Sequence, residues 1–122
     1  MRILIVDDEP NIRISLEGLL LDEGHAVASC PDGESALERT GRETFDAILL
    51  DVMLPGMSGL DVIRRIRKSD PDAAVIMMSG HADTATAVAA VQAGARQFME
   101  KPVDPQDLRH NIQLLLEGET SV

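Results

Sequence analysis

Five short strand-like segments alternate with five helical stretches along this sequence of 122 residues. The third segment, Phe45–Leu50, shows the pattern most clearly, because its apolar residues are followed at once by Asp51 and soon after by Pro55-Gly56. A short apolar run closed by turn residues is typical of a strand that is buried on both faces of a parallel sheet. Strict alternation of such strands with helices predicts an α/β fold with helices on both faces of the sheet. Right-handed crossovers leave few topologies, but the periodicity does not fix the strand order.

The other predicted elements follow from the same reasoning. The remaining strands are Ile3–Val6, His25–Ser29, Ala74–Met78 and Gln97–Glu100, of which the last is short, less apolar and expected at an edge. Helices are expected from Pro10 to near Gly24, from Ala36 to near Gly41, from a Ser58 cap to Asp70, over Thr84–Ala93, and from Pro105 onward. The side chains expected to face the core are Ile12, Leu16, Leu19, Leu20, Leu60, Ile63, Ile66, Leu108, Ile112 and Leu115. A basic run, Arg64, Arg65, Arg67 and Lys68, is expected to lie mostly on a solvated helix face, with partner docking as the alternative.

The net charge limits the partners that this chain can have. A formal charge of -10 argues against direct binding to nucleic acid or to an anionic membrane, and favours a cation ligand or a partner with a basic patch. The single cysteine, Cys30, excludes an internal disulfide bond and suits a reducing compartment. The apolar run Ile3–Val6 stops at acids and no apolar run is long enough to cross a membrane, so we expect neither a signal peptide nor a membrane span, and we expect a cytoplasmic protein.

Polar side chains stand where four of the five predicted strands end. Asp7 and Asp8 follow the first strand, Asp51 the third and Ser79 the fourth, and Lys101 follows the fifth. If the strands run parallel in one sheet, these residues meet at its carboxyl edge, where ligands of open α/β sheets bind. Three carboxylates close together repel one another, and a divalent hard cation such as Mg²⁺ relieves the repulsion. The sequence therefore predicts a cation site at this edge.

This combination of residues suggests phosphoryl chemistry. With a metal ion beside it, Asp51 could attack a phosphoryl group and form an aspartyl phosphate, while Lys101 balances the phosphoryl charge and Ser79 donates a hydrogen bond. Each residue also has a structural alternative. Asp51 could begin a turn or cap a helix, Asp7 and Asp8 could favour a helix N-terminus, Ser79 could cap the next helix, and Lys101 could be a surface lysine.

Taken together, these motifs resemble the receiver domain of two-component response regulators. The resemblance covers Ile3 to about Leu116 and includes Leu54–Gly59 after the acceptor, Gly94-Ala95 before the last strand, and Phe98 at the family's aromatic switch position. It implies a flavodoxin-like, doubly wound sheet with strand order 2-1-3-4-5. We expect residues 1–117 to form the receiver domain and residues 118–122 a polar tail.

The resemblance also implies an acceptor and a metal site. Asp51 is expected to accept the phosphoryl group from a sensor histidine kinase. Asp8, Asp51 and the backbone carbonyl of Met53 are expected to ligate Mg²⁺ (or Mn²⁺), and Asp7 is expected to help directly or through water. Such a domain is a signalling phosphoacceptor rather than an enzyme in the usual sense.

The remaining roles concern the switch. Lys101 is expected to bond phosphoryl oxygens, and its peptide bond to Pro102 is expected to be cis. Ser79 is expected to move toward the phosphate, and Phe98 to turn inward into the space that Ser79 leaves. The fourth helix, fifth strand and fifth helix would then form the output face toward a C-terminal output domain, a partner protein or, after phosphorylation, a second copy.

Details within the family pattern point to a subclass. The segments Ser79–Ala82 and Phe98–Pro102 look most like the nitrogen-regulator (NtrC/NtrX-like) class, whose members activate transcription. Arg96 and Gln97 replace the acids or aromatics common before the switch position, which argues against the dimer salt bridges of the winged-helix class. A haloacid-dehalogenase-type phosphohydrolase would need an acid where Met53 stands. A flavin-binding domain would need glycine, serine or threonine residues to hold phosphate in the loop after the first strand, where this chain has two acids. The remaining alternative is a receiver fold that no longer accepts phosphate and only binds partners.

Overall fold

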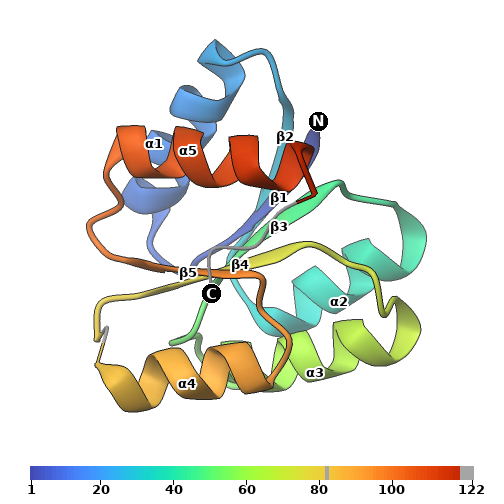
Figure 1. The fold of residues 1–122 in the computed structure, drawn as a ribbon. Helices are drawn as coiled ribbons and strands as arrows, with labels where there is room; N and C mark the ends of the chain where they lie inside the picture. The colour runs from blue at the N-terminus through green and yellow to red at the C-terminus, as the bar shows by residue number, and fades with distance from the viewer. Residues whose placement is uncertain (82, 119–122) are drawn as a thin grey trace.

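The protein, described here from a computed structural model, contains one five-stranded parallel sheet with the order β2-β1-β3-β4-β5 (Figure 1). The structure describes residues 1–81 and 83–118, with residue 116 described in its backbone only. The strands are β1 (Arg2–Val6), β2 (Ala26–Cys30), β3 (Ala47–Asp51), β4 (Val75–Ser79) and β5 (Gln97–Glu100). The helices are α1 (Pro10–Asp22), α2 (Gly33–Arg42), α3 (Gly59–Ser69), α4 (Thr84–Gln92) and α5 (Pro105–Leu116). The predicted fold class and strand order are therefore confirmed.

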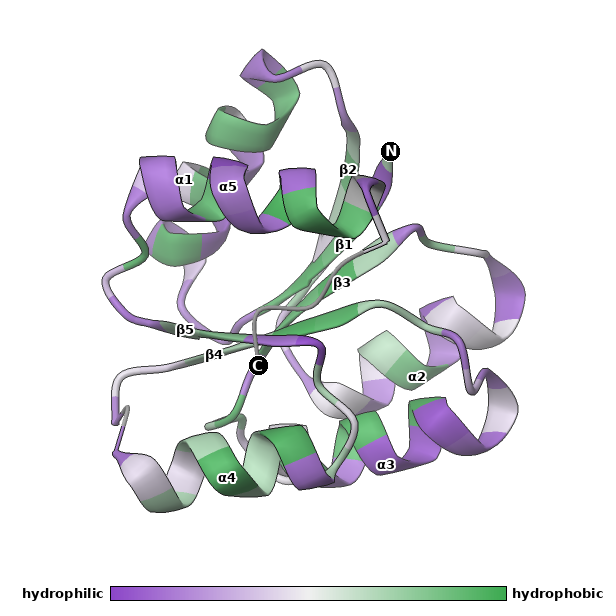
Figure 2. Cartoon of the chain, viewed as in Figure 1, coloured by the Kyte–Doolittle hydropathy of each residue, from purple (hydrophilic) through white to green (hydrophobic). Residues whose placement is uncertain are grey.

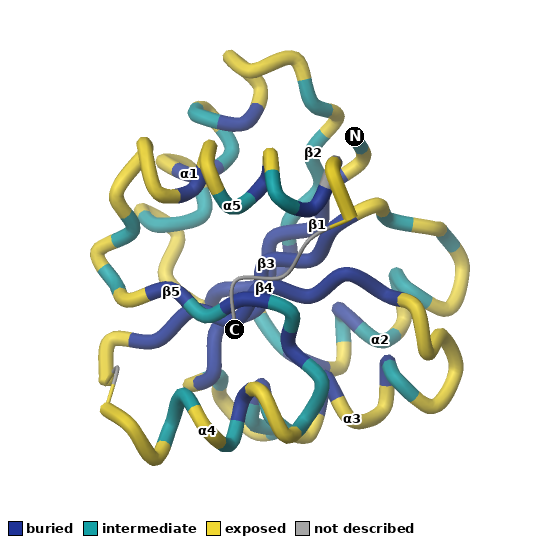
Figure 3. Tube along the Cα trace, viewed as in Figure 1, coloured by how far each residue is buried: buried dark blue, intermediate teal, exposed yellow. Residues whose placement is uncertain are grey.

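The helices form two layers, as the sequence predicted. In Figure 1, α1 and α5 cover one face of the sheet, and α2, α3 and α4 cover the other. Successive side chains of a strand point to opposite faces, so each central strand supplies both cores. In β1, Leu4 and Val6 belong to the core under α2, α3 and α4, while Ile3 and Ile5 belong to the core under α1 and α5. The three central strands, β1, β3 and β4, are hydrophobic along most of their length and largely buried, whereas the edge strand β2 is mostly half-buried (Figures 2 and 3).

Strand register determines where each strand ends. Residues Ile3 to Val6 pair with Ala47 to Leu50, and Leu50 and Asp51 pair with Met77 and Met78. Farther along, Ser79 pairs with Glu100, so Lys101 emerges beside the end of β4. The ends of β1, β3, β4 and β5 therefore reach the same edge of the sheet.

The helix boundaries reflect local capping. Asp32, Ser58, Asp83 and Asp104 stand at the N-caps of α2, α3, α4 and α5, and the side chain of each accepts a hydrogen bond from a backbone N–H of its first turn. Such a cap contributes about 1 kcal/mol of helix stability. The cap of α4 is thus Asp83, and the alternative reading of Ser79 as that cap is wrong.

The buried helix faces match the predicted stripes, with one addition in α3. Leu108, Ile112 and Leu115 of α5 are buried, and α3 buries Val62 besides the predicted Ile63 and Ile66. Arg67 departs from the rest of the basic run of α3, because it is half-buried and bonded to main-chain carbonyls.

Two sequence expectations concern the ends and surface of the chain. Helix α5 ends at Leu116, and of the predicted polar tail only residue 118 belongs to the described part, since residues 119–122 lie outside it.

Within residues 1–81 and 83–118, no helix has the length and apolar character needed to span a bilayer.

Candidate functional site

The residues predicted from the strand ends lie together at the carboxyl edge of the sheet. Asp7 and Asp8 follow β1, Asp51 is the last residue of β3, Ser79 the last of β4, and Lys101 directly follows β5. Asp7, Asp51 and Ser79 are buried, whereas Asp8 is exposed. This arrangement produces a site with a buried floor and one acid at its solvent side.

The Lys101 ammonium group lies between two buried carboxylates. It donates a hydrogen bond to Asp51 Oδ2 over 2.7 Å, and it lies 2.6 Å from Asp7 Oδ2. The side chain of Lys101 is only 12% exposed, so water screens these ion pairs weakly. Its reading as an ordinary surface lysine is therefore wrong.

Backbone N–H groups hold the other oxygen of each carboxylate. The Glu9 N–H donates to Asp7 Oδ1 over 2.9 Å, and the Met53 N–H donates to Asp51 Oδ1 over 3.0 Å. Each carboxylate is thus oriented with Oδ2 toward Lys101. Asp51 does begin a turn, as the structural alternative proposed, but its second oxygen remains directed into the site.

The charges of Asp7, Asp51 and Lys101 favour the binding of an additional cation. Burial raises the pKa of Asp51, and the negative charge of Asp7 adds to the effect, although the bonds from Lys101 and the Met53 amide oppose it. Burial works against the protonated form of Lys101, but its ion pairs with Asp51 and Asp7 prevail and raise its pKa. Three carboxylates against one ammonium leave excess negative charge, which an additional cation would neutralise.

The acidic residues have the geometry and chemistry of a hard-cation site. Asp7, Asp8 and Asp51 each offer a carboxylate oxygen, and these oxygens lie within 4.8 Å of one another. Asp7 Oδ2 is buried and, although close to Lys101, accepts no well-directed hydrogen bond. Carboxylate oxygens at such spacing are the ligands that Mg²⁺ uses in proteins, so the residues present fit this ion.

Ser79 and Lys101 are joined through the backbone. The Lys101 N–H donates to the Ser79 carbonyl over 2.9 Å, and the peptide bond between Lys101 and Pro102 is cis. Ser79 Oγ accepts a hydrogen bond from the His81 N–H over 3.0 Å. Because Oγ is the acceptor in this bond, the hydroxyl hydrogen is not used by it.

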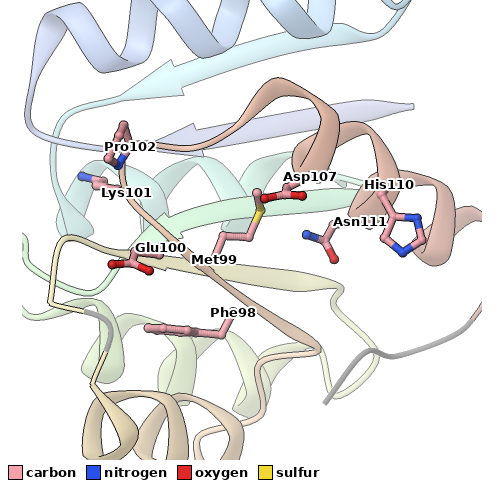
Figure 4. Close-up of a pocket in the computed structure, with 8 residues that line it drawn as sticks. All are labelled: Phe98, Met99, Glu100, Lys101, Pro102, Asp107, His110 and Asn111. Atoms are coloured by element: carbon pink, nitrogen blue, oxygen red, sulfur yellow. The ribbon is translucent and has the colours of Figure 1, made fainter.

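Phe98 stands apart from the charged site. It pairs with Met77 across β4 and β5 and packs, half-buried, against the core under α2, α3 and α4. In Figure 4, the Lys101 and Phe98 side chains point away from the α5 residues Asp107 and His110. A cavity of about 410 Å³ between β5 and α5 is lined by Phe98, Met99, Glu100, Lys101, Pro102, Asp107, His110 and Asn111 (Figure 4).

Two residues contribute to the site without having been assigned a role from the sequence. Arg13 Nη1 donates to the main-chain carbonyl of Asp7 over 2.6 Å, which ties α1 to the end of β1. Gly59 begins α3 directly against β3, and a Cβ atom there would overlap the Asp51 carbonyl oxygen. A glycine at the first position of a helix is the signal that could have identified this close approach.

Comparison with known proteins agrees with the motifs. Residues 3–113 match the family described as the response regulator receiver domain. The nitrogen assimilation regulatory protein NtrX of Azorhizobium caulinodans is 40% identical over 108 residues, which are 87% of this chain and 24% of that protein. The DNA-binding response regulator MtrA of Mycolicibacterium smegmatis is 38% identical over 115 residues, which are 94% of this chain and 50% of that protein.

A solved structure supports the same assignment. The CheY-like response regulator receiver domain protein from Methanospirillum hungatei JF-1 has a TM-score of 0.91 and 34% identity, and the match covers 96% of this chain and 94% of that one. The chain spans about half the length of MtrA and about a quarter of NtrX. NtrX carries the name of the nitrogen-regulator class that the sequence resembles, and MtrA shows that the similarity extends to other regulators.

Proposed function

The chain belongs to the receiver domain family of two-component response regulators, and from this we propose that Asp51 accepts a phosphoryl group from a sensor histidine kinase. The observation that carries the proposal is the buried Asp51 carboxylate, held at 2.7 Å from the Lys101 ammonium beside two further acids. A nucleophilic carboxylate, a counter-cation and a set of metal ligands in one place are the groups that phosphoryl transfer to an aspartate requires.

The transfer itself uses one carboxylate oxygen of Asp51. That oxygen attacks the phosphorus of a phosphohistidine, the phosphorus–nitrogen bond breaks, and its electron pair returns to the imidazole of the kinase. The Met53 N–H keeps the other oxygen of Asp51 in place during the attack. The Lys101 ammonium then turns from the Asp51 carboxylate to the phosphoryl oxygens, which lie within its reach.

Asp7, Asp8, Asp51 and the backbone carbonyl of Met53 would hold Mg²⁺ (or Mn²⁺). When bound, such an ion supplies positive charge that offsets the developing charge on the phosphoryl oxygens. The acids alone would repel a phosphoryl donor, so we infer that transfer requires the ion.

We further propose how the site signals. Ser79 turns its hydroxyl hydrogen toward the phosphoryl group, and Phe98 moves into the space that Ser79 leaves. The face of α4, β5 and α5 changes as a result and controls an output domain or partner, with transcription as the expected output and a phosphorylation-dependent homodimer as one form. In this proposal residues 1–117 form the receiver domain, which does not contact nucleic acid itself, and the location is cytoplasmic.

A chemical map of the phosphorylated residue tests the acceptor assignment. After incubation with acetyl phosphate and Mg²⁺, borohydride reduction converts an aspartyl phosphate into homoserine, which peptide mass spectrometry locates. We expect homoserine at position 51 and none at positions 7 or 8. Asp8→Asn should lower the yield while leaving the position unchanged, because Asp8 acts through the metal. Homoserine at position 7 or 8 would contradict the assignment.

A further inference from the structure

Arg67 is the member of the basic run on α3 that turns into the protein. Its Nη2 donates to the Gly94 carbonyl, and its Nη1 donates to the Pro71 carbonyl over 2.9 Å. Burial, followed by the nearby charge of Arg96, lowers the pKa of Arg67 below its usual value. A guanidinium group is suited to this position because it donates several hydrogen bonds in fixed directions.

The residues that Arg67 joins lie in two neighbouring connections. Pro71 belongs to the connection between α3 and β4, and Gly94 belongs to the turn between α4 and β5. A second arginine bridges the same connections, because Arg96 Nη2 donates to the Asp72 carbonyl over 3.3 Å. We call Arg67, Arg96 and the carbonyls of Pro71, Asp72 and Gly94 the arginine clasp.

Gly94 allows the Arg67 side chain of the arginine clasp to approach the turn after α4. Its φ of +107° lies in a region that side chains disfavour, and a Cβ atom there would lie 2.5 Å from Arg67 Nε. The Arg67 side chain therefore lies directly against the turn that ends α4. Ala90, the α4 residue that is completely buried, bonds through its carbonyl to the Ala95 N–H within the same turn.

The other end of α4 is held by local contacts. Asp83 and Thr84 are exposed, and the cap bond from the Thr86 N–H to Asp83 Oδ1 stays within the first turn. Among residues 1–81 and 83–118, no side chain of another element bonds to Thr84–Gln92. Helix α4 contains no charged residue, so long-range ion pairs do not hold it either.

We propose that Arg67 is a positioning residue of the switch, which fixes the C-terminal end of α4 so that phosphorylation swings its N-terminal end about Gly94. The N-terminal end is the one that follows Ser79, where the phosphoryl signal arises in the proposed function on which this inference rests. A helix held firmly at one end and loosely at the other moves by pivoting, because the free end has fewer contacts to break.

Hydrogen exchange measured by mass spectrometry tests the proposal. The protein is compared with and without beryllium fluoride and Mg²⁺, which together mimic a phosphoryl group on an aspartate. The variants are Arg67→Gln, the conservative Arg67→Lys, and Arg65→Gln as a control that removes an exposed arginine from the same helix. Peptides from β1 and β3 report global stability in every sample.

In the resting protein, Arg67→Gln should raise exchange at the Gly94 and Ala95 amides by about tenfold over the core peptides, and Arg65→Gln should not. Arg67→Lys should restore part of the protection. The mimic should change exchange in residues 83–88 of the unmodified protein and leave residues 90–95 unchanged. In Arg67→Gln, the change should extend through residues 90–95.

Different outcomes separate this inference from the proposed function. If Arg67→Gln behaves like Arg65→Gln, or if both ends of α4 respond equally in the unmodified protein, the pivot is wrong although the switch itself stands. If the bound mimic changes exchange nowhere in α4, the proposed switching of this face is wrong and the pivot falls with it.

Discussion

Among single residues, Lys101 has the largest part in the electrostatics of the site. Its ammonium group neutralises part of the charge of Asp7 and Asp51, at 2.6 and 2.7 Å, inside a weakly solvated pocket. Without an ion it is the counter-charge that keeps two buried carboxylates together. Metal binding and Lys101 therefore act on the same carboxylates.

Replacing Lys101 with glutamine should separate the effect of the Lys101 charge on stability from the effect of a bound metal ion. Leaving two buried carboxylates without their cation should lower the unfolding free energy by about 3–5 kcal/mol in EDTA. Mg²⁺ should recover much of this loss, because a bound ion replaces the missing positive charge. Urea denaturation with EDTA and with Mg²⁺ measures both values. Lys68→Gln, at an exposed position of α3, is the control, and equal losses in the two variants would contradict the account.

The thiol of Cys30 gives a prediction about pH. Burial raises its pKa to about 11, and the charge of Asp32 adds to the effect. The folded protein therefore keeps the thiol proton at pH values where the unfolded chain, with a pKa near 9.0, has lost it. The contribution of this group to stability is complete below about pH 9 and is lost as the pH rises toward 11.

Alkylation kinetics check this prediction. Two pKa units reduce the thiolate fraction about a hundredfold at pH 8, so native Cys30 should react with iodoacetamide at least that much more slowly than the urea-unfolded chain. Since Cys30 is the single cysteine, the reaction reports one site. Comparable rates in the folded and unfolded protein would show that the thiol is not buried.

Among the elements, α5 and α4 differ in how they are attached. Helix α5 buries Leu108, Ile112 and Leu115 against the sheet, whereas Ala90 is the buried residue of α4 and its Val88 is 48% exposed. Burial of large apolar side chains stabilises a helix far more than burial of alanine. We therefore expect α4 to move more than α5 when the site is phosphorylated.

Truncation of Leu108 tests the anchoring of α5. Leu108→Ala should lower the unfolding free energy by about 2–5 kcal/mol, because it removes a fully buried side chain and leaves a cavity. Leu21→Ala is a matched control, since Leu21 is 57% exposed on α1 and its truncation should cost less than about 0.5 kcal/mol. Urea denaturation at fixed pH measures both. A loss at position 108 no larger than that at position 21 would contradict the packing described here.

For the whole molecule, much of the architecture could be predicted from local sequence. Short apolar runs and turn residues located every strand and helix, although the caps Asp32, Asp83 and Asp104 were not recognised and α2 begins at Gly33 rather than at Ala36. The polar residues at the strand ends do lie together at one edge of the sheet, as their positions predicted. The strand order came from resemblance to a family, because hydrophobic periodicity carries no information about which strands are neighbours.

The details that sequence missed depend on contacts between distant segments. Arg67 belongs to a basic run and bonds to Gly94 only because the fold brings two connections together. The close approach of Gly59 to the Asp51 carbonyl likewise depends on how α3 meets β3. Patterns of charge and hydropathy describe one element at a time, and these contacts join two.

The overall charge of -10 gives the site its context. A strongly acidic domain attracts cations and basic partners, and it repels a phosphoryl donor unless positive charge is placed at the site. Lys101 supplies part of this charge, and a divalent cation bound to the three acids would supply the rest.

Intact-mass spectrometry after incubation with acetyl phosphate, with Mg²⁺ or with EDTA, shows whether Asp51 accepts a phosphoryl group and whether the transfer needs the divalent cation. We expect a single phosphoryl adduct in Mg²⁺, little or none in EDTA, and none in Asp51→Asn, whose unfolding transition should remain cooperative. Full labelling of Asp51→Asn, or equal labelling of the unmodified protein in EDTA, would contradict the account.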